Sequence, residues 1–186
     1  MTQTRSHPLA WVPNALTVGR LAALPLLALM LWRADGPTDP ASAWLFAAVG
    51  LTDLLDGYLA RRWHAETAFG RVADPFADRM LVAVGLIGLI LLDRFPAAGP
   101  LVILGRDAIT MLAVVALARS GLDLRVDFLG KSSSALVMAA TALALVSTAD
   151  WIDGLFWVAV GLSLVAFGHY AVTASRAWRS SRRRAG

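Results

Sequence analysis

Four aspartates within one short stretch are the residues of this chain best placed to do chemistry. Asp53 and Asp56 are three positions apart, and Asp74 and Asp78 are four positions apart. Residues at these spacings share one face of an α-helix. If the two pairs lie on neighbouring helices whose acidic ends meet, their carboxylates face one another. The spacing therefore predicts a cluster of four carboxylates between two helices.

Such a cluster needs a positive partner, because each charge inside an apolar bundle costs about 3 kcal/mol. An all-oxygen ligand set, with neither a cysteine nor a suitably spaced histidine, favours Mg²⁺ or Mn²⁺ over zinc. Two ions about 3.5–4 Å apart, shared by carboxylates, are a recurrent device for attack at phosphorus. Two alternatives stay open: neutralisation by Arg61, Arg62 and Arg79, or a proton path through a membrane.

The residues between the aspartates point to a phosphate ligand. Gly57 and Ala60 are small, so a bulky ligand can come close to the helix backbone. Arg61 stands one turn further along, where its planar fork can hold a diphosphate. Gly70 opens the next helix one turn before Asp74 and leaves room there.

Composition places this chemistry in a membrane. Of the 186 residues, 58% are hydrophobic and 16% are charged, and the mean hydropathy is +0.63. A soluble domain carries about 25% charged residues. We expect one integral membrane domain over residues 1–186, with a basic tail at 176–186 and no linker or repeat. The N-terminal residues lack the early apolar run of a secretory signal, so we expect them in the mature protein.

Six apolar segments come close to the roughly 20 residues that a helix needs to cross the hydrocarbon layer. The expected fold is an all-α integral membrane bundle of six transmembrane helices. A short segment at Leu9–Val12, ahead of Pro13-Asn14, is expected to lie along the interface. The six expected spans are Ala15–Trp32, Ala41–Ala60, Asp74–Leu92, Pro100–Ala118, Leu129–Val146 and Ile152–Ser175.

The positive charges predict the orientation of these spans. Twelve of the 17 cations fall on the side of the two termini, and only Arg33 and Arg94 fall opposite. The positive-inside rule then puts both termini and the aspartate cluster on the cytoplasmic side of the cytoplasmic membrane. A nucleic-acid role for the arginine-rich tail is the weaker interpretation, because such clusters after a span usually set topology and touch anionic lipid. We expect no nucleic-acid partner. The twelve are Arg5, Arg61, Arg62, Arg71, Arg119, Arg125, Lys131, Arg176, Arg179, Arg182, Arg183 and Arg184.

The stretch as a whole has the spacing D-x2-D-G-x2-A-R-x8-G-x3-D-x3-D, and it resembles the signature of the CDP-alcohol phosphatidyltransferase family. All eight fixed positions match. The resemblance extends to an Arg106-Asp107 pair, to a Gly130-Lys131 pair, and to an N-terminal P-N-x-L-T-x-x-R element filled by Pro13, Asn14, Leu16, Thr17 and Arg20.

The resemblance implies an activity, a set of site residues and partners. Family members transfer a phosphatidyl group from a CDP-activated lipid, here CDP-diacylglycerol, to an alcohol and release CMP. By this resemblance Asp53, Asp56 and Asp74 are metal ligands, and Asp78 shares the second metal and acts as general base. Gly57, Ala60, Arg61 and Gly70 form the nucleotide cradle by the same resemblance, which also implies a homodimer in contact with membrane lipids.

The chain resembles one branch of the family, which contains phosphatidylglycerophosphate and cardiolipin synthases. This resemblance implies a glycerol-type acceptor. The phosphatidylglycerophosphate synthases are expected to carry Arg-Glu, a second arginine two turns on, and G-K-x-K-T. This chain differs from that pattern at three positions: Asp107 replaces the glutamate, Val114 the second arginine and Ser133 the second lysine. Two missing cations favour phosphatidylglycerol over glycerol 3-phosphate as acceptor. Arg106 and Lys131 are predicted to bind the acceptor phosphate, and inositol phosphate or serine are lower alternatives.

Two other classes of protein are less consistent with the pattern. An intramembrane prenyltransferase also holds a diphosphate through aspartates and Mg²⁺, but its two clusters lie far apart in sequence. An ion-path transporter would spread acidic residues through several spans, and the interiors of the first, fifth and sixth expected spans have none.

Overall fold

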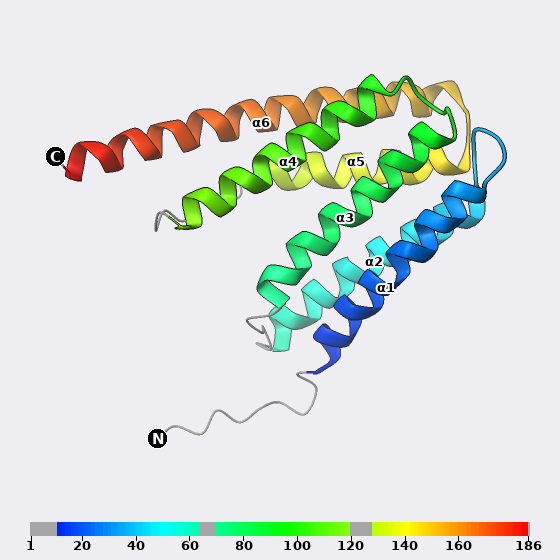
Figure 1. Cartoon of the computed structure of the whole chain (residues 1–186), viewed down its shortest axis with the longest axis horizontal. Helices are drawn as coiled ribbons and strands as arrows, with labels where there is room; N and C mark the ends of the chain where they lie inside the picture. Colours follow the sequence, from blue (N-terminus) through cyan, green and yellow to red (C-terminus); the bar gives the residue numbers. More distant parts are fainter. Residues whose placement is uncertain (1–10, 64–69, 120–127, 186) are drawn as a thin grey trace.

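The computed structural model describes an all-helical chain (Figure 1). The backbone is described for residues 11–63, 70–119 and 128–185, and side chains for 18–52, 76–113, 130–173 and 175. This part of the chain contains six α-helices and no strand, as the sequence predicts. The helices are α1 (Trp11–Arg33), α2 (Pro40–Trp63), α3 (Gly70–Leu91), α4 (Ala98–Arg119), α5 (Phe128–Val146) and α6 (Asp150–Ala185).

The helix ends differ from the expected ones by four residues or more in three places. The break expected at Pro13-Asn14 is wrong, because α1 runs from Trp11 through both residues. A proline in the first helical turn lacks an N–H that would have no helical partner there anyway, so it does not stop the helix. Helix α3 starts at Gly70, before the expected span, and α6 continues through the basic tail to Ala185.

The helices converge at one end of the bundle, where the connections 34–39, 92–97 and 147–149 lie (Figure 1). Helix α3 contacts α1, α2, α4 and α5, and α6 contacts α4 and α5. Because α3 touches four neighbours, its side chains can join both halves of the bundle. This central position matters for the site described below.

An aspartate cap links the α1–α2 connection to α5. Asp39 precedes Pro40, the first residue of α2, and its Oδ2 accepts hydrogen bonds from the Ser42 N–H at 3.3 Å and from the Ser42 hydroxyl. This is the arrangement expected of an N-cap residue followed by proline. The Asp39 N–H donates to the Leu145 carbonyl at 2.9 Å, which holds the connection against the end of α5.

Arg94 links the α3–α4 connection to the start of α6. Its guanidinium pairs with Asp153 and donates to the Ser147 carbonyl at 3.3 Å. It also lies 4.5 Å from the centre of the Phe95 ring, which stacks on Phe156 at 4.2 Å. The same end of the bundle is therefore closed by an ion pair resting on an aromatic stack.

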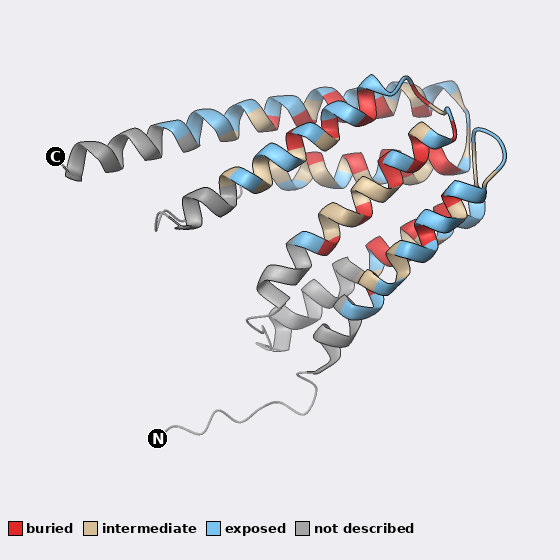
Figure 2. Cartoon of the chain, in the orientation of Figure 1, coloured by how far each residue is buried: buried red, intermediate tan, exposed pale blue. Residues whose placement is uncertain are grey.

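The core of the described part of the chain includes buried residues of α3 (Figure 2), and it depends on the close approach of other helices to α3. A Cβ atom on Gly85 would lie 2.5 Å from the Phe46 ring and 2.9 Å from the Thr141 methyl group. On Gly88 it would lie 2.6 Å from Leu31. Glycine therefore lets α1, α2 and α5 pack against α3. The largest fully buried side chains are Phe46, Phe156, Leu27, Leu31, Leu81, Leu86, Leu89, Ile103, Leu145, Ile152 and Val137.

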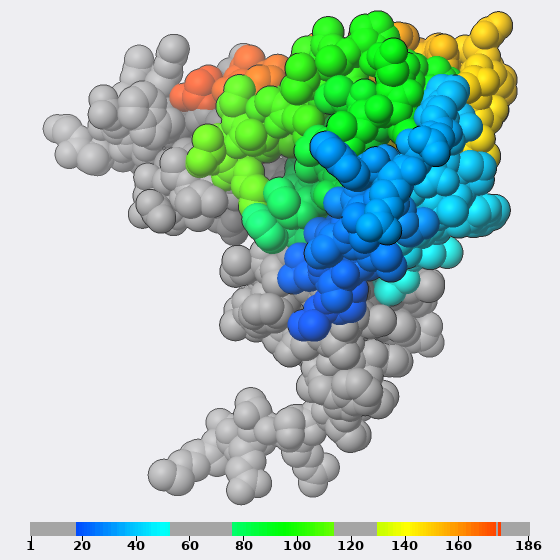
Figure 3. Space-filling view, turned by 45° about the vertical axis from the view of Figure 1, so that its right-hand side comes forward, coloured from blue at the N-terminus to red at the C-terminus, as the bar shows by residue number. Residues whose placement is uncertain are grey.

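Large apolar side chains are also exposed on all six helices, as expected for a protein in lipid, and Figure 3 shows one face of the molecule with α1 and α4 at its surface. Soluble proteins rarely expose contiguous apolar patches of more than a few hundred Å². Among the described residues, Asp150–Thr173 of α6 is long and apolar enough to cross a membrane, and Pro40–Thr52 and Gly130–Val146 are shorter apolar stretches. The exposed residues include Trp32, Trp44, Leu51, Phe76, Ile87, Leu101, Ile109, Leu112, Trp151, Val158 and Val165.

The close approach at Gly85 predicts unequal effects of two matched glycine substitutions. Gly85→Ala should lower the melting temperature in detergent, since overpacking costs about 1–3 kcal/mol. Gly161→Ala, on an exposed face of α6 with open space at its Cβ, should leave the melting temperature unchanged or raise it. Tryptophan fluorescence during heating measures both. Equal effects of the two substitutions would contradict the packing described here.

Candidate active site

The eight motif positions fall at the facing ends of α2 and α3. Seven of their side chains lie outside the described residues, although the backbone is helical at each of these positions. Because the helix is continuous, each acidic pair keeps the spacing that puts its members on one face. Helices α2 and α3 contact each other. The carboxylate cluster itself stays a prediction. The seven are Asp53, Asp56, Gly57, Ala60 and Arg61 on α2, and Gly70 and Asp74 on α3.

Asp78 is the motif residue whose side chain is described, and it lies beside a buried arginine of α1. The NH1 atom of Arg20 is 3.6 Å from Asp78 Oδ1. The Arg20 side chain is 1% exposed, whereas that of Asp78 is 48% exposed. The guanidinium therefore supports the carboxylate from the protein side while the carboxylate remains accessible to a ligand.

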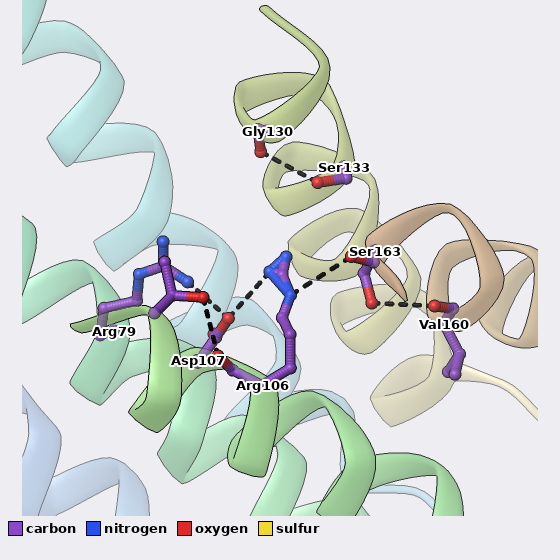
Figure 4. Close-up of polar contacts among 8 residues, drawn as sticks. Arg79, Arg106, Asp107, Gly130, Ser133, Val160 and Ser163 are labelled. Carbon is purple, nitrogen blue, oxygen red and sulfur yellow. Dashed lines mark hydrogen bonds and ion pairs between the residues drawn. The ribbon is translucent and has the colours of Figure 1, made fainter. Parts of the chain in front are cut away.

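Arg79, the next residue of α3, belongs to a second charged group on the other side of the helix. Its NH1 atom contacts Asp107 Oδ1 on α4, and the Arg106 NH1 atom lies 2.9 Å from the same oxygen. Figure 4 shows the two guanidinium groups on either side of that carboxylate. The Asp107 and Arg106 side chains are 14% and 7% exposed, and that of Arg79 is 31% exposed. Arg79, Arg106 and Asp107 are called the arginine–aspartate cluster below.

The Arg106 guanidinium is held in place by α6. Its Nε donates to the Ser163 carbonyl at 3.4 Å, while the Ser163 hydroxyl donates to the Val160 carbonyl at 2.8 Å (Figure 4). Helix α6 thus fixes the plane of the guanidinium from one side and Asp107 fixes it from another. Such a fixed fork presents its remaining N–H groups in a defined direction, which suits a phosphate or carboxylate.

Adjacent residues of α3 connect these two groups of charges. Successive residues of an α-helix point about 100° apart, so Asp78 reaches α1 while Arg79 reaches α4. Charged and polar contacts consequently run from Arg20 through α3 to Arg106 and the α6 backbone. Charges at this depth of an apolar bundle are expensive unless paired, and each one here has a charged neighbour.

The two residues predicted to bind the acceptor phosphate differ in how far they are buried. Arg106 is buried in the arginine–aspartate cluster, whereas Lys131 near the start of α5 is exposed. None of the contacts described for the chain joins Lys131 to Arg106. Ser133, where a second lysine is expected in the glycerol-phosphate branch, is fully buried and donates to the Gly130 carbonyl at 3.0 Å. Its hydroxyl is turned toward its own helix and adds no positive charge.

The donor chemistry of the motif fits a divalent cation. The predicted ligands are all carboxylates, which suit Mg²⁺ or Mn²⁺, and Asp78 is accessible for coordination. Within the described residues there is no group of three or more histidine, cysteine or acidic side chains that could hold a metal. Three of the four predicted ligands, Asp53, Asp56 and Asp74, are outside that part of the chain.

Sequence reasoning missed two of the pairings. It left open, as one alternative, that Arg79 neutralises the acidic motif together with Arg61 and Arg62, whereas the described contact of Arg79 is to Asp107. It quoted Arg20 within the N-terminal element but gave it no role. The sequence does hold one signal: adjacent charged residues of a helix, such as Asp78 and Arg79, point in different directions, so each needs its own partner. This signal does not identify the partner.

Comparisons with known proteins identify the family to which the chain is similar. A sequence model of the CDP-alcohol phosphatidyltransferase family matches residues 10–166. A cardiolipin synthase (CMP-forming) of Streptomyces coelicolor is 36% identical over 85% of this chain and 73% of the relative.

Relatives with a second acceptor in their names match as well. The CDP-diacylglycerol–glycerol-3-phosphate 3-phosphatidyltransferase of Bacillus subtilis is 33% identical over 86% of this chain and 92% of its own length. The chloroplastic/mitochondrial enzyme 1 of the same name from Arabidopsis thaliana is 36% identical over 86% of this chain and 61% of its own length.

An all-helical, apolar chain with this motif on two touching helices belongs to a class of membrane phosphotransferases. More specifically, the match over residues 10–166 shows that the chain belongs to the CDP-alcohol phosphatidyltransferase family. The predicted family and the prediction of a phosphatidyltransferase enzyme are both confirmed. The family generally uses divalent metal ions, which agrees with the donor set of the motif.

Proposed function

We propose that this protein transfers the phosphatidyl group of CDP-diacylglycerol to a hydroxyl of phosphatidylglycerol, giving cardiolipin and CMP. The carrying observation is that the family match contains all eight motif positions, on two helices that contact each other. The accessible carboxylate of Asp78 beside Arg20 supports a reaction centre at this depth of α3.

Different residues of the motif have different roles in this proposed reaction. Asp53, Asp56, Asp74 and Asp78 would hold two Mg²⁺ or Mn²⁺ ions, which when bound supply positive charge to the diphosphate and to the departing CMP. Arg61 would hold the diphosphate, and Gly57, Ala60 and Gly70 would leave room for the nucleotide.

Asp78 would act as the general base in that arrangement. It takes the proton of the acceptor hydroxyl while the hydroxyl oxygen attacks the phosphorus that bears diacylglycerol. The bond from this phosphorus to the bridging diphosphate oxygen breaks, and CMP leaves with the bond electrons. Arg20 would keep the Asp78 carboxylate in position during the transfer.

Glycerol 3-phosphate is the second candidate acceptor. It is supported by the names of the Bacillus subtilis and Arabidopsis thaliana relatives. Phosphatidylglycerol is favoured by the buried Ser133 and by Val114, which replace two expected cations, and by the name of the Streptomyces coelicolor relative.

We further propose that the six helices span the cytoplasmic membrane with both termini inside. The shortest of them, α5, has 19 residues, or about 28 Å at 1.5 Å per residue, close to the hydrocarbon thickness of about 30 Å. The arginines near the termini and in the connections on their side favour this orientation. The chain is proposed to act as a homodimer, and a monomer mass by light scattering in detergent would contradict that.

The proposed reaction predicts that CMP is released only with a suitable acceptor and an intact Asp78. The detergent-purified protein should release CMP from CDP-diacylglycerol and Mg²⁺ with phosphatidylglycerol, and more slowly with glycerol 3-phosphate. Asp78→Asn should reduce the rate at least 100-fold, since general base catalysis contributes about 10²–10⁴. The assay measures CMP by chromatography.

Asp93→Asn is the matched control for this substitution. Asp93 lies two residues beyond the last residue of α3, at the end of the helix opposite to Asp78, and it has φ 51°, a conformation that asparagine also accepts. The control should keep the parent rate. CMP release that persists in Asp78→Asn would remove the general base from the proposal, and no release with any alcohol would refute the proposed reaction.

The proposed topology predicts opposite labelling of two single cysteines in intact cells. The chain has no cysteine, so Asp35→Cys in the α1–α2 connection and Ser181→Cys in the tail each provide a single thiol. A membrane-impermeant maleimide should label Asp35→Cys in intact cells but Ser181→Cys only after lysis. Labelling of the tail in intact cells would contradict the orientation.

A further inference from the structure

We propose that Asp107 limits the negative charge that the phosphate group of the acceptor can carry. The inference rests on the proposed function and deepens it: the arginine–aspartate cluster selects a phosphodiester, with one negative charge, over a phosphate monoester. Asp107 does this by neutralising one of two arginines that would otherwise both face the acceptor.

The two candidate acceptors have the same reactive group and differ at the phosphate. Glycerol 3-phosphate and phosphatidylglycerol present the same glycerol hydroxyl, separated from a phosphate by the same three carbons. They differ at the phosphate, which in the first is a monoester of about −1.5 to −2 charge and in the second a diester with a single charge. A site that binds the glycerophosphate group can therefore distinguish the two acceptors by the charge of the phosphate.

The cluster carries a charge that matches the diester. Arg79 and Arg106 each contribute one positive charge and Asp107 one negative charge, which leaves one positive charge. Three-quarters or more of Arg106 and Asp107 is shielded from solvent, so their charges act with little screening by water. Lys131 is exposed and Ser133 is buried and uncharged, so neither changes this balance within the buried cluster. The glycerol-phosphate branch is also expected to have a carboxylate at the position of Asp107, but together with two cations that Val114 and Ser133 replace here, so those two charges do not offset the carboxylate in this chain.

The geometry leaves both arginines able to bind a further anion. Asp107 contacts Arg79 and Arg106 through the same oxygen, Oδ1, and through one NH1 atom of each. A guanidinium has five N–H donors, so neither fork is used up by a carboxylate bound in this way. Arg79 is 31% exposed, which gives a ligand access to it.

The cluster also lies at the level of α3 where the acceptor hydroxyl is proposed to react. Arg79 follows Asp78 directly on α3, so the two residues are about 1.5 Å apart along the helix axis, and an acceptor that reaches Asp78 with its hydroxyl can place its phosphate, three carbons away, toward Arg79. The Ser163 carbonyl keeps Arg106 turned into the cluster. Asp107 acts here as a specificity-determining residue, because it works through the charge and orientation of the two arginines.

The test compares the two acceptors in the parent protein and in variants of Asp107. The readout is kcat/KM for CMP release with glycerol 3-phosphate divided by kcat/KM with phosphatidylglycerol, in the same mixed micelles. Asp107→Asn should raise this ratio about tenfold, mainly through a lower KM for glycerol 3-phosphate, because the cluster then carries two positive charges. Asp107→Glu should keep the ratio of the parent.

Asp153→Asn is the matched control. It removes the same charge from another arginine–aspartate pair, that with Arg94 at the opposite end of the bundle, and should not change the ratio. A ratio in Asp107→Asn within twofold of the parent, or an equal change in Asp153→Asn, would overturn the proposal. If Asp107→Asn does not fold, Arg79→Gln can be used instead. It removes one positive charge from the cluster and should lower the ratio. An unchanged ratio in Arg79→Gln would overturn it as well.

A binding measurement separates this proposal from the proposed reaction. Glycerol 3-phosphate, added without CDP-diacylglycerol, should raise the melting temperature of Asp107→Asn more than that of the parent. If the parent releases no CMP with any acceptor, the proposed reaction fails while this binding comparison still tests the cluster. Equal stabilisation of both proteins, or of neither, would refute the role of Asp107.

Discussion

Every charge inside an apolar helical bundle needs a partner, and this requirement organises the structure around α3. Asp78 and Arg79 are adjacent in sequence, yet one is paired toward α1 and the other toward α4. These two contacts fix the rotation of α3 about its axis. The same rotation turns Gly85 and Gly88 toward Phe46 and Leu31, so that ion pairing and close packing support a single arrangement.

The two ends of the bundle use ionic contacts for different purposes. At the end where the short connections meet, Arg94 and Asp153 rest on an aromatic stack and join two connections. Deeper in the bundle, the partly exposed Asp78 and Arg79 belong to pairs that a ligand can still reach. The ion pair that closes the bundle is thus separate from the pairs proposed to serve the reaction, which makes Asp153 a fair control for Asp107.

Much of this could be predicted from the sequence, for identifiable reasons. The helices followed from long apolar runs separated by turn residues, and the family followed from eight positions at fixed spacing. The start of α1 was misjudged at Pro13, because proline stops a helix only beyond its first turn. The partners of Arg20 and Arg79 could not be predicted, since pairing between helices depends on how each helix is rotated, and spacing along one helix does not determine this.

The claim on which this account most depends is that the acidic ends of α2 and α3 form one divalent-metal site. Electron paramagnetic resonance of Mn²⁺ titrated into the purified protein tests it directly, because bound and free ions give different signals. We predict two bound ions per chain, an affinity lowered at least tenfold in Asp74→Asn, and parent-like binding in Asp93→Asn. Equal binding by the parent and Asp74→Asn, or no binding by the parent, would contradict the account.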